Sequence, residues 1–578
     1  MSGGPWARPA AGREPAAAAL LGWLADPDAP RLCVVSGGAG CGKSTLLAWL
    51  VGHGTRPVTA PERRVHAFVP LAGQGVRGTV WTLAEQLGVV ARAPGELLAA
   101  LAADERRTVI VLPDLHAAAD AEAVAALVSS LVGPGHVRLL VEARTGHGAV
   151  RLLDACGPAV LDLDEERWTD PVRRAAWQAT QAASGCLPGS PEPDGPEPDG
   201  PEPDGPEPDG PPAAGAPDLG DPAVVCAADP VRVTAAYETG TDRCGGLRAA
   251  WLRAGQSLMR DQSPAERALV LLTVLGDGAD PRMRPALAEL SAGVPWEPVW
   301  SRIRGDVTPP WPGPALALAT GPGPLDGRFL VADHQGVLRT AALIDAAATG
   351  RLPRPVPGVT ALCALADGTV WALDDQGRLH TRRLPTAGGP SGLAALLGDT
   401  PSPGDAAAER LTARLADVPG SALAASGRAA AAGGVDGAVY AVSLDEDGTA
   451  PRTAHLHRGR VTALGAVDVP AGESGHVTPL VYSGGVDGRV RVWAPGGEPM
   501  AVPVVERSCA VTALGCALAP SGPALAVGWA DGLVEHHRLG TGETRAFHPG
   551  QPVNALALTP DERLLIGTDE AVLCLRPR

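Results

Sequence analysis

The sequence predicts a multidomain protein with an α/β domain first, a small helical module next and an all-β domain last. Apolar strand-like runs alternate with helical patterns over residues 1–186, helical periodicity returns over 222–308, and short strands with tight turns repeat over 309–578. A chain of 578 residues has room for three or four domains. Because 45% of its residues are apolar, it can bury a large core despite its 73 glycines and 58 prolines.

The first domain is expected to be an α/β layered structure, since its strands and helices alternate. Its strand-like runs are Leu32–Ser36, Val65–Pro70, Val109–Leu112, Val137–Glu142 and Ala159–Leu163. Its helical patterns lie near Lys43–Val51, Thr79–Gly88, Gly95–Ala103 and Asp120–Val132. A further helix is expected after Thr169, with Thr169 as its cap and Asp170 and Pro171 in its first turn.

A linker rich in Pro, Glu, Asp and Gly is expected over residues 187–221. Its core, 191–210, repeats PEPDG and contributes eight acidic residues to a chain with a net charge of −16. Frequent proline and like charges favour an extended, self-repelling spacer, and an acidic docking segment is the alternative. In the helical module that follows, Ser263 and Glu266 form a capping-box signature, and Asp280-Pro281 is expected to begin another helix.

The last domain is built from a repeat that pairs a short apolar strand with a second strand ending in a tight turn. The first strand reads VTAL at 359–362, 461–464 and 511–514, and VNAL at 553–556. The turns are Gln335-Gly336, Gln376-Gly377, Asp436-Gly437, Asp487-Gly488, Asp531-Gly532 and the degenerate Glu570-Ala571. An Asp-Gly pair between alternating apolar residues is a strong hairpin signal.

The unit SGGVDGRVRVW, residues 483–493, resembles the WD-repeat family of β-propellers. Trp493 stands where the family's Trp-Asp pair begins, and Ala494 replaces the Asp. The resemblance covers residues 313–578 in six recognisable blades, and the longer spacing between Gly377 and Gly437 is an insertion or a decayed seventh blade. It implies a ring that docks protein partners; another repetitive all-β fold is the alternative.

A phosphate-binding loop is predicted between the first strand and the helix that follows it. The pattern G-x-x-x-x-G-K-[ST] is matched by Gly37, Gly38, Ala39, Gly40, Cys41, Gly42, Lys43, Ser44 and Thr45. In such a P-loop NTPase domain, glycines let backbone N–H groups cradle phosphate oxygens, and Lys43 reaches the β- and γ-phosphates. Ser44 would contact Mg²⁺ and Thr45 the α-phosphate. Lys43 is the only lysine in the chain, a bias typical of GC-rich genomes such as those of actinobacteria.

The expected ligand is ATP or ADP with Mg²⁺. GTP is disfavoured because guanine readers use an N-K-x-D motif, which needs another lysine. The strand end VIVLPDLH, residues 109–116, looks like the metal-side acid motif, with Asp114 as its acid. His116 is more readily explained as a cap or surface residue than as a catalytic one.

These motifs resemble the STAND class, the signal-transduction ATPases with numerous domains, over residues 10–180. Gly12-Arg13-Glu14 and the segment 161–171 look like segments of that class. Its members place two acids before Leu-His, one holding Mg²⁺ and one polarising the attacking water. Pro113 replaces the first acid, so Asp114 either takes over the metal or stays the catalytic acid, and hydrolysis is expected to be slow. Arg144 corresponds to the class's γ-phosphate sensor, or is a plain strand-end arginine.

The resemblance implies an ATP-dependent regulatory switch in which the propeller senses or docks a protein partner, with possible nucleotide-dependent self-association. The alternative is a WD-repeat scaffold whose ATP site is structural; a LuxR-like transcription regulator is a weaker third hypothesis, since the chain ends inside a blade.

Composition excludes several other functions. The acidic net charge disfavours nucleic-acid binding. No apolar run reaches the 18 residues of a membrane span, and Ala16–Ala25 is interpreted as a helix rather than a signal peptide. The ten cysteines include no C-x-x-C pair, which fits a reducing, cytoplasmic location.

Overall fold

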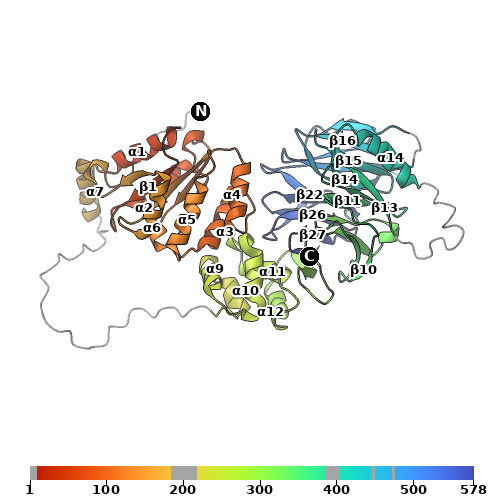
Figure 1. The fold of residues 1–578 in the computed structure, drawn as a ribbon, viewed down its shortest axis with the longest axis horizontal. Coiled ribbons are helices and arrows are strands. Elements are labelled where there is room, and N and C mark those ends of the chain that lie inside the picture. The colour runs from red at the N-terminus through yellow and green to blue at the C-terminus, as the bar shows by residue number, and fades with distance from the viewer. Residues whose placement is uncertain (1–8, 184–217, 385–401, 446–448, 472–475) are drawn as a thin grey trace. The chain divides into compact units, whose positions relative to one another are not determined.

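The computed structural model describes residues 9–183, 218–384, 402–445, 449–471 and 476–578. The chain forms two compact units, shown in Figure 1. The N-terminal unit contains Met1–Leu87, Ala91–Asp218 and Ala228–Gly240, and the propeller unit contains Gly88–Val90, Leu219–Ala227 and Thr241–Arg578. The PEPDG repeat lies outside the described residues, so its expected role as a spacer stays a prediction.

The N-terminal unit is built on a five-stranded parallel sheet with the order β2-β3-β4-β1-β5. Its strands are β1 Leu32–Ser36, β2 Ala67–Phe68, β3 Thr108–Leu112, β4 Val137–Glu142 and β5 Ala159–Asp162. Each one coincides with a run expected to be a strand, and only β3 extends beyond its run, by one residue at Thr108. All residues of β1, β3 and β4 are buried, as expected of continuous apolar runs in a parallel sheet.

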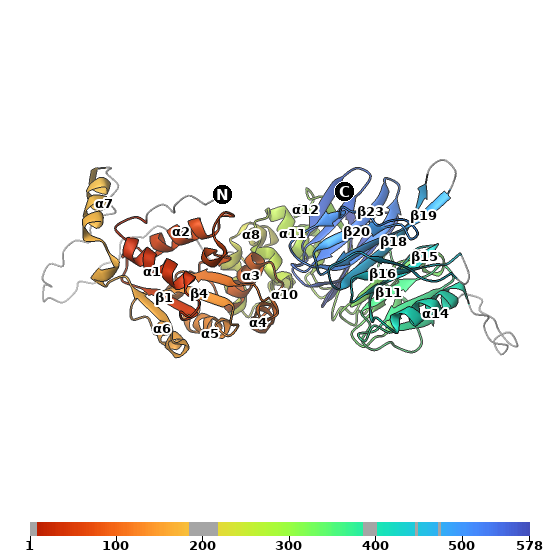
Figure 2. The same ribbon diagram turned by 90° about the horizontal axis from the view of Figure 1, so that it is seen from above.

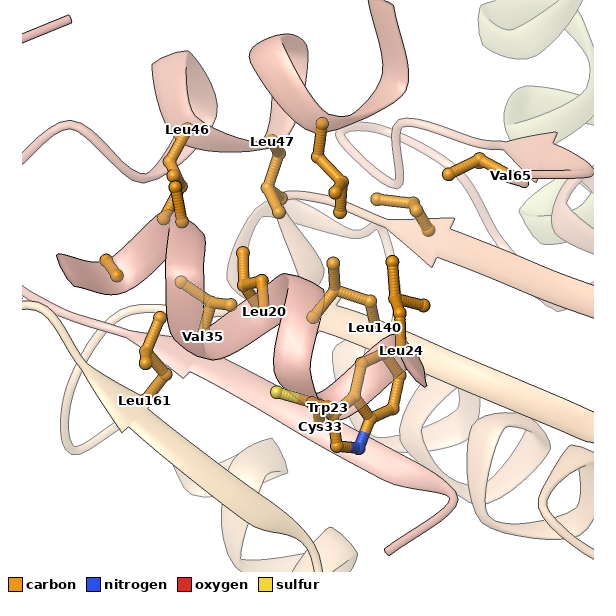
Figure 3. Packing of buried hydrophobic residues seen from close by; sticks show 14 of the residues in the cluster. Leu20, Trp23, Leu24, Cys33, Val35, Leu46, Leu47, Val65, Leu140 and Leu161 are labelled. Atoms are coloured by element: carbon orange, nitrogen blue, oxygen red, sulfur yellow. The ribbon is translucent and has the colours of Figure 1, made fainter. Parts of the chain in front are cut away.

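Helices cover both faces of this sheet. They are α1 Glu14–Ala25, α2 Lys43–Gly54, α3 Val76–Leu87, α4 Pro94–Ala103, α5 Ala121–Leu131, α6 Gly148–Leu153 and α7 Pro171–Ala183. Figure 2 shows α1 and α2 on one side of the sheet and α5 and α6 on the other. Figure 3 shows how Leu20 and Leu24 of α1 and Leu46 of α2 pack with Val35 and Leu140 of the sheet. This core fixes the start of α2 against the end of β1.

The start of α7 differs in detail from the expectation. Asp170, not Thr169, caps the helix, because its carboxylate accepts the backbone N–H of Val172 at 3.0 Å and of Arg173 at 3.1 Å. The Thr169 hydroxyl instead accepts a hydrogen bond from Arg13 at 2.7 Å. The cap therefore leaves Thr169 free to join the segment before α1 to the segment after β5.

The residues expected to form one helical module divide between the two units. Helix α9, Pro230–Thr239, belongs to the N-terminal unit, where Glu238 accepts the backbone N–H of Arg77 at 3.1 Å. The propeller unit holds α8 Pro222–Ala227, α10 Leu247–Ala254, α11 Pro264–Thr273 and α12 Met283–Leu290. The capping box predicted at Ser263 and Glu266 is present at the start of α11.

The C-terminal domain is a six-bladed β-propeller. Its inner strands contact one another in a closed cycle, β7-β11-β14-β18-β22-β26 and back to β7. The first three blades are β7 Ala317–Ala319, β8 Arg328–Ala332, β9 Leu338–Ala342, β10 Ala348–Arg351; β11 Ala361–Ala364, β12 Thr369–Leu373, β13 Leu379–Arg383; and β14 Gly420–Ala425, β15 Ala429–Gly434, β16 Ala438–Ser443, β17 Arg452–His455. The next two are β18 Val461–Ala471, β19 His476–Gly485, β20 Arg489–Trp493, β21 Val505–Glu506; and β22 Val511–Ala519, β23 Gly522–Trp529, β24 Val534–Arg538, β25 Glu543–Phe547.

The sixth blade joins the two ends of the propeller sequence. It contains β26 Val553–Leu558, β27 Leu564–Thr568, β28 Ala571–Pro577 and, as its outer strand, β6 Trp296–Ile303. Strand β6 runs antiparallel to β28 and comes from residues expected to belong to the helical module. Its sequence, WEPVWSRI, lacks a clean alternation of apolar and polar residues, and its partner is remote in the chain. Pairing across the ends closes the ring and covers a strand edge.

The long spacing between the second and third turns holds a helix. Helix α14, Pro403–Leu415, follows the three-stranded second blade and contacts β13 and β16. Residues 385–401 of this spacing lie outside the described residues. Among those that are described, the extra length is an insertion and not a seventh blade.

The repeated turn glycines are required where the structure places them. Gly336 and Gly488 both have a φ of 72°. A Cβ would lie 2.0 Å from the Val356 carbonyl oxygen at Gly336, and 2.1 Å from that of Arg507 at Gly488. Only glycine therefore permits both the left-handed turn and the close approach of the following chain.

A buried Ser-His-Asp group in the fourth blade has a structural role. His457 Nδ1 lies 2.9 Å from Asp487 Oδ1, and its Nε2 lies 2.8 Å from Ser483 Oγ. The same residue types form the catalytic group of many hydrolases. Here the His457 side chain and Ser483 are each 0% exposed, so no substrate reaches the hydroxyl. The group instead ties the segment between β17 and β18, which holds His457, to β19 and to the turn at Asp487 that follows it.

We expect two buried histidines to make the propeller sensitive to acid. Burial lowers the pKa of both His536 and His548 to about 4. In the unfolded chain these groups bind protons near pH 6.5, so between pH 6.5 and 4 the unfolded state holds more protons. The free energy of unfolding should therefore fall as pH drops through this window, by about 3 kcal/mol per histidine at most.

Thermal melting at pH 7.5 and pH 5 measures this effect. His536→Leu should lose less stability than wild type on acidification, because the variant lacks this group with a lowered pKa. Both ring nitrogens of His536 are buried without a hydrogen-bond partner among the described residues. His334→Gln, at an exposed position, serves as the control and should keep the wild-type dependence. An equal loss in wild type and His536→Leu would contradict the role of His536.

Candidate functional site

The predicted phosphate loop lies between β1, which ends at Ser36, and α2, which begins at Lys43. Gly40 and Gly42 have left-handed backbones, with φ of 71° and 94°. At Gly37, whose φ is 151°, a Cβ would lie 2.5 Å from the Cys41 sulfur. The loop thus has the strand and helix context that the motif requires, and its glycines are needed for its shape.

Lys43 is folded into the loop. It is 6% exposed, and its Nζ donates hydrogen bonds to the carbonyl oxygens of Gly37 at 2.9 Å and Gly38 at 2.8 Å. Ser44 and Thr45, in the first turn of α2, are exposed. The positive end of α2 and these three side chains therefore lie at one place, which favours an anionic ligand.

The strand carrying the predicted acid ends at the same edge of the sheet. Pro113 and Asp114 follow β3, and Pro113 is buried while Asp114 is half-buried. Asp114 has a φ of 61°, an uncommon left-handed conformation for a residue other than glycine. Such backbone conformations gather at functional sites.

Glu142 is a further acid at this edge, and no sequence motif predicted its role. It ends β4, is 1% exposed, and places Oε1 4.0 Å from Lys43 Nζ. Its Oε2 is buried without a hydrogen-bond partner among the described residues. Burial and the nearby Asp114 carboxylate raise the pKa of Glu142, while Lys43 acts in the opposite direction. The available signal was an acid at the end of the apolar run VRLLVE.

Arg144 lies two residues beyond the end of β4 and is exposed. Its charge acts on His116, whose pKa is lowered first by burial and then by Arg144. The His116 ring in turn lies 6.4 Å from the ring of His147. The fold therefore gathers Lys43, Asp114, Glu142 and Arg144 around the carboxyl ends of neighbouring parallel strands, where α/β proteins bind ligands.

Two segments remote in sequence hold the loop in place. The backbone N–H of Gly38 donates to both carboxylate oxygens of Asp164, at 3.0 and 2.9 Å, just after β5. Arg13, in the segment before α1, donates to the Leu163 carbonyl oxygen at 3.1 Å and also to the carbonyl oxygen of Cys41. The sequence pointed to Gly12-Arg13-Glu14 and to the segment 161–171, but it gave Asp164 no role of its own within that segment.

The residues at this edge fit a nucleotide phosphate with Mg²⁺. A Cβ added at Gly40 meets nothing within 4 Å, so the outer part of the loop is open. The available groups are hydroxyl and carboxylate oxygens, which Mg²⁺ prefers, and it usually takes only one or two protein ligands beside phosphates and water. The orphaned Oε2 of Glu142 gives such a site an unused acceptor.

The propeller carries its own cavity. A space of about 670 Å³ lies at one end of the ring, lined by segments that follow several inner strands. Apolar side chains such as Val467 and Leu518 line it together with Asp326, Asp468 and Asp561. The cavity in the central channel is much smaller, with a volume of about 70 Å³. Because Arg328 and Arg563 also line the larger cavity, its opening is apolar with charges of both signs, which suits a protruding side chain or short segment of another protein.

Within the described ranges, none of the helices is both long enough and apolar enough to cross a bilayer. No protein-family model matches the chain, and no curated protein is detectably similar to it. The chain is a multidomain protein in which a parallel α/β unit is followed by helices and a six-bladed propeller, a fold suited to protein interaction.

Proposed function

We propose that this chain is an ATP-binding regulatory switch of the STAND type, in which the propeller docks a protein partner and nucleotide state controls signalling. The observation that carries the proposal is the loop itself. The only lysine of the chain ends a glycine loop between a buried strand and a helix, beside the Glu142 carboxylate. This combination of residue types is suited to binding the phosphates of a nucleoside triphosphate.

Each residue has a role that follows from its place. Lys43 would exchange its bonds with Gly37 and Gly38 for the β- and γ-phosphates of ATP, and the loop amides would hold the remaining phosphate oxygens. Ser44 and Asp114 would face Mg²⁺, which neutralises phosphate charge when bound. The exposed Arg144 would contact the γ-phosphate and so distinguish ATP from ADP.

The contacts of the loop support a switch. Gly38 is bonded to Asp164 and Cys41 to Arg13, so the segment before α1 and the segment between β5 and α7 both meet at the loop. Arg13 also bonds Thr169, and Arg173 at the start of α7 pairs with Glu14 at 2.6 Å. A change of loop shape on nucleotide exchange would therefore move the start of α7. Ordering and release of such a segment by a γ-phosphate is a common switching device.

The propeller would bind the protein partner. The exchange of ADP for ATP would also control self-association. A switch that depends on ATP would work in the cytoplasm. The second candidate function is a propeller scaffold with a structural ATP site that turns over slowly or not at all. Pro113 favours it, because proline has no side-chain oxygen to offer where the class has an acid.

Nucleotide content and turnover test the proposal. The full chain, purified from its host under native conditions, should carry ATP or ADP, and the proteins that come with it identify partners. Phosphate release at saturating Mg²⁺ and ATP should lie well below ~10 s⁻¹, the median of enzymes, and should rise when a co-purified protein is added. Bound nucleotide without turnover under any condition would favour the scaffold. A chain that binds no nucleotide would overturn both.

A further inference from the structure

We infer that Glu142 is the catalytic carboxylate of the ATP site. It would take the water-polarising part that Asp114 gives up when Asp114 serves the metal in place of the acid that Pro113 replaces. The inference rests on the proposed function and adds a residue to it. Glu142 would accept a hydrogen bond from the water that attacks the γ-phosphorus, while Asp114 remains on the side of the metal.

The sheet order places Glu142 between the two motifs. Strand β4 lies between β1, which leads into the phosphate loop, and β3, which leads into Asp114. Glu142 is in register with Val35 of β1, one residue before the end of that strand. A side chain at this position can face both the phosphates and the metal side, whereas Pro113 has no polar side chain.

The Glu142 carboxylate is buried with one oxygen unpaired in the described part of the chain, and this arrangement calls for an explanation. It is 1% exposed, its Oε1 lies 4.0 Å from Lys43 Nζ, and its Oε2 has no hydrogen-bond partner within the described residues. A buried carboxylate oxygen left unsatisfied is costly, and a native structure keeps one where it has a task. Because Lys43 would turn to the phosphates when ATP binds, the carboxylate would then be available to a water molecule.

The reaction balances without any further reactant. The water oxygen forms a bond to the γ-phosphorus, and the bond to the β–γ bridging oxygen breaks. The electron pair of that bond leaves with ADP, and the water proton leaves on the phosphate product. Glu142 orients the water through its free oxygen and is unchanged at the end.

A purely structural role is the competing explanation, in which Glu142 only neutralises Lys43. The two roles differ in what they do to binding. A counter-ion of Lys43 competes with the phosphates, so its removal would strengthen ATP binding and leave turnover per bound ATP unchanged. An acid that orients water contributes to the chemical step and little to binding.

The test compares ATP affinity and phosphate release in the full-length protein. Glu142→Gln keeps the shape of the side chain and should lower the turnover number at least about 100-fold, with ATP affinity within about threefold of wild type. Glu142→Asp, which moves the carboxylate back, should also lose turnover and guards against a folding defect in the first variant. Glu122→Gln, at an exposed position on α5, is the control and should behave as wild type.

Rescue provides a readout that a structural role would not move. Pro113→Asp restores the acid that holds Mg²⁺ in the class and would free Asp114 to polarise the water. The double variant Pro113→Asp/Glu142→Gln should therefore regain turnover relative to Glu142→Gln. Unchanged turnover in Glu142→Gln, or tighter ATP binding with normal turnover, would overturn the inference. Wild-type ATP binding without any hydrolysis would also overturn it and leave binding standing, whereas a wild type that binds no ATP would remove the proposed function itself.

Discussion

Replacing Lys43 by alanine is expected to weaken ATP binding at least about 30-fold, which corresponds to the ~2–3 kcal/mol of a charge-assisted hydrogen bond. Lys43 is buried at the base of the loop, and its Nζ bonds two loop carbonyl oxygens. The same geometry would present it to the β- and γ-phosphates. The loop's amides and the start of α2 would remain, so weak binding should persist.

Equilibrium binding of ATP to wild type and Lys43→Ala measures the effect, with thermal melting as a check on folding. Lys43→Arg should also bind poorly, because a planar guanidinium does not replace a compact ammonium in this loop. Arg351→Ala removes a positive charge from an exposed residue of β10 and should bind ATP like wild type. Equal affinity in Lys43→Ala and wild type would show that ATP does not bind at this loop.

Removing residues 551–578 is expected to unfold the propeller cooperatively or to cause aggregation. The deletion removes β26, β27 and β28, and so takes away the partners of β6 and the blade between β22 and β7. The ring would then present open strand edges, which promote association between chains. Size-exclusion chromatography and thermal melting test the result. A monomeric truncation with the wild-type melting transition would contradict closure through the sixth blade.

A single substitution tests closure of the ring through the sixth blade without deleting a strand. Trp300, on β6, is 8% exposed, stacks on Phe329 with ring centroids 5.6 Å apart, and donates its indole N–H to the Leu343 carbonyl oxygen at 2.8 Å. Trp300→Ala should cost about 3–5 kcal/mol of stability. Val299→Ala, next to it and 38% exposed, is the matched control and should cost far less.

Local sequence was sufficient for the five strands and most helices of the N-terminal unit and for the glycine-rich loop between β1 and α2, whereas α6 was not expected. Strands such as β1 and β4 are short, fully apolar runs, and α2 begins directly after a glycine-rich motif, so neighbouring residues alone specify them. The same holds for the propeller turns, because Gly336 and its counterparts require a backbone that only glycine adopts easily. These predictions depended on spacing and residue type within a few positions.

Tertiary structure decided the features that join remote segments. Strand β6 was not expected, because its pairing with β28 depends on closure of the whole ring and not on its own pattern. The role of Glu142 depends on the sheet order, which places β4 between β1 and β3. The role of Asp164 depends on the fold bringing the segment after β5 to Gly38. A sequence specifies each strand through local periodicity, whereas the neighbours of a strand depend on how all the strands bury their apolar faces together.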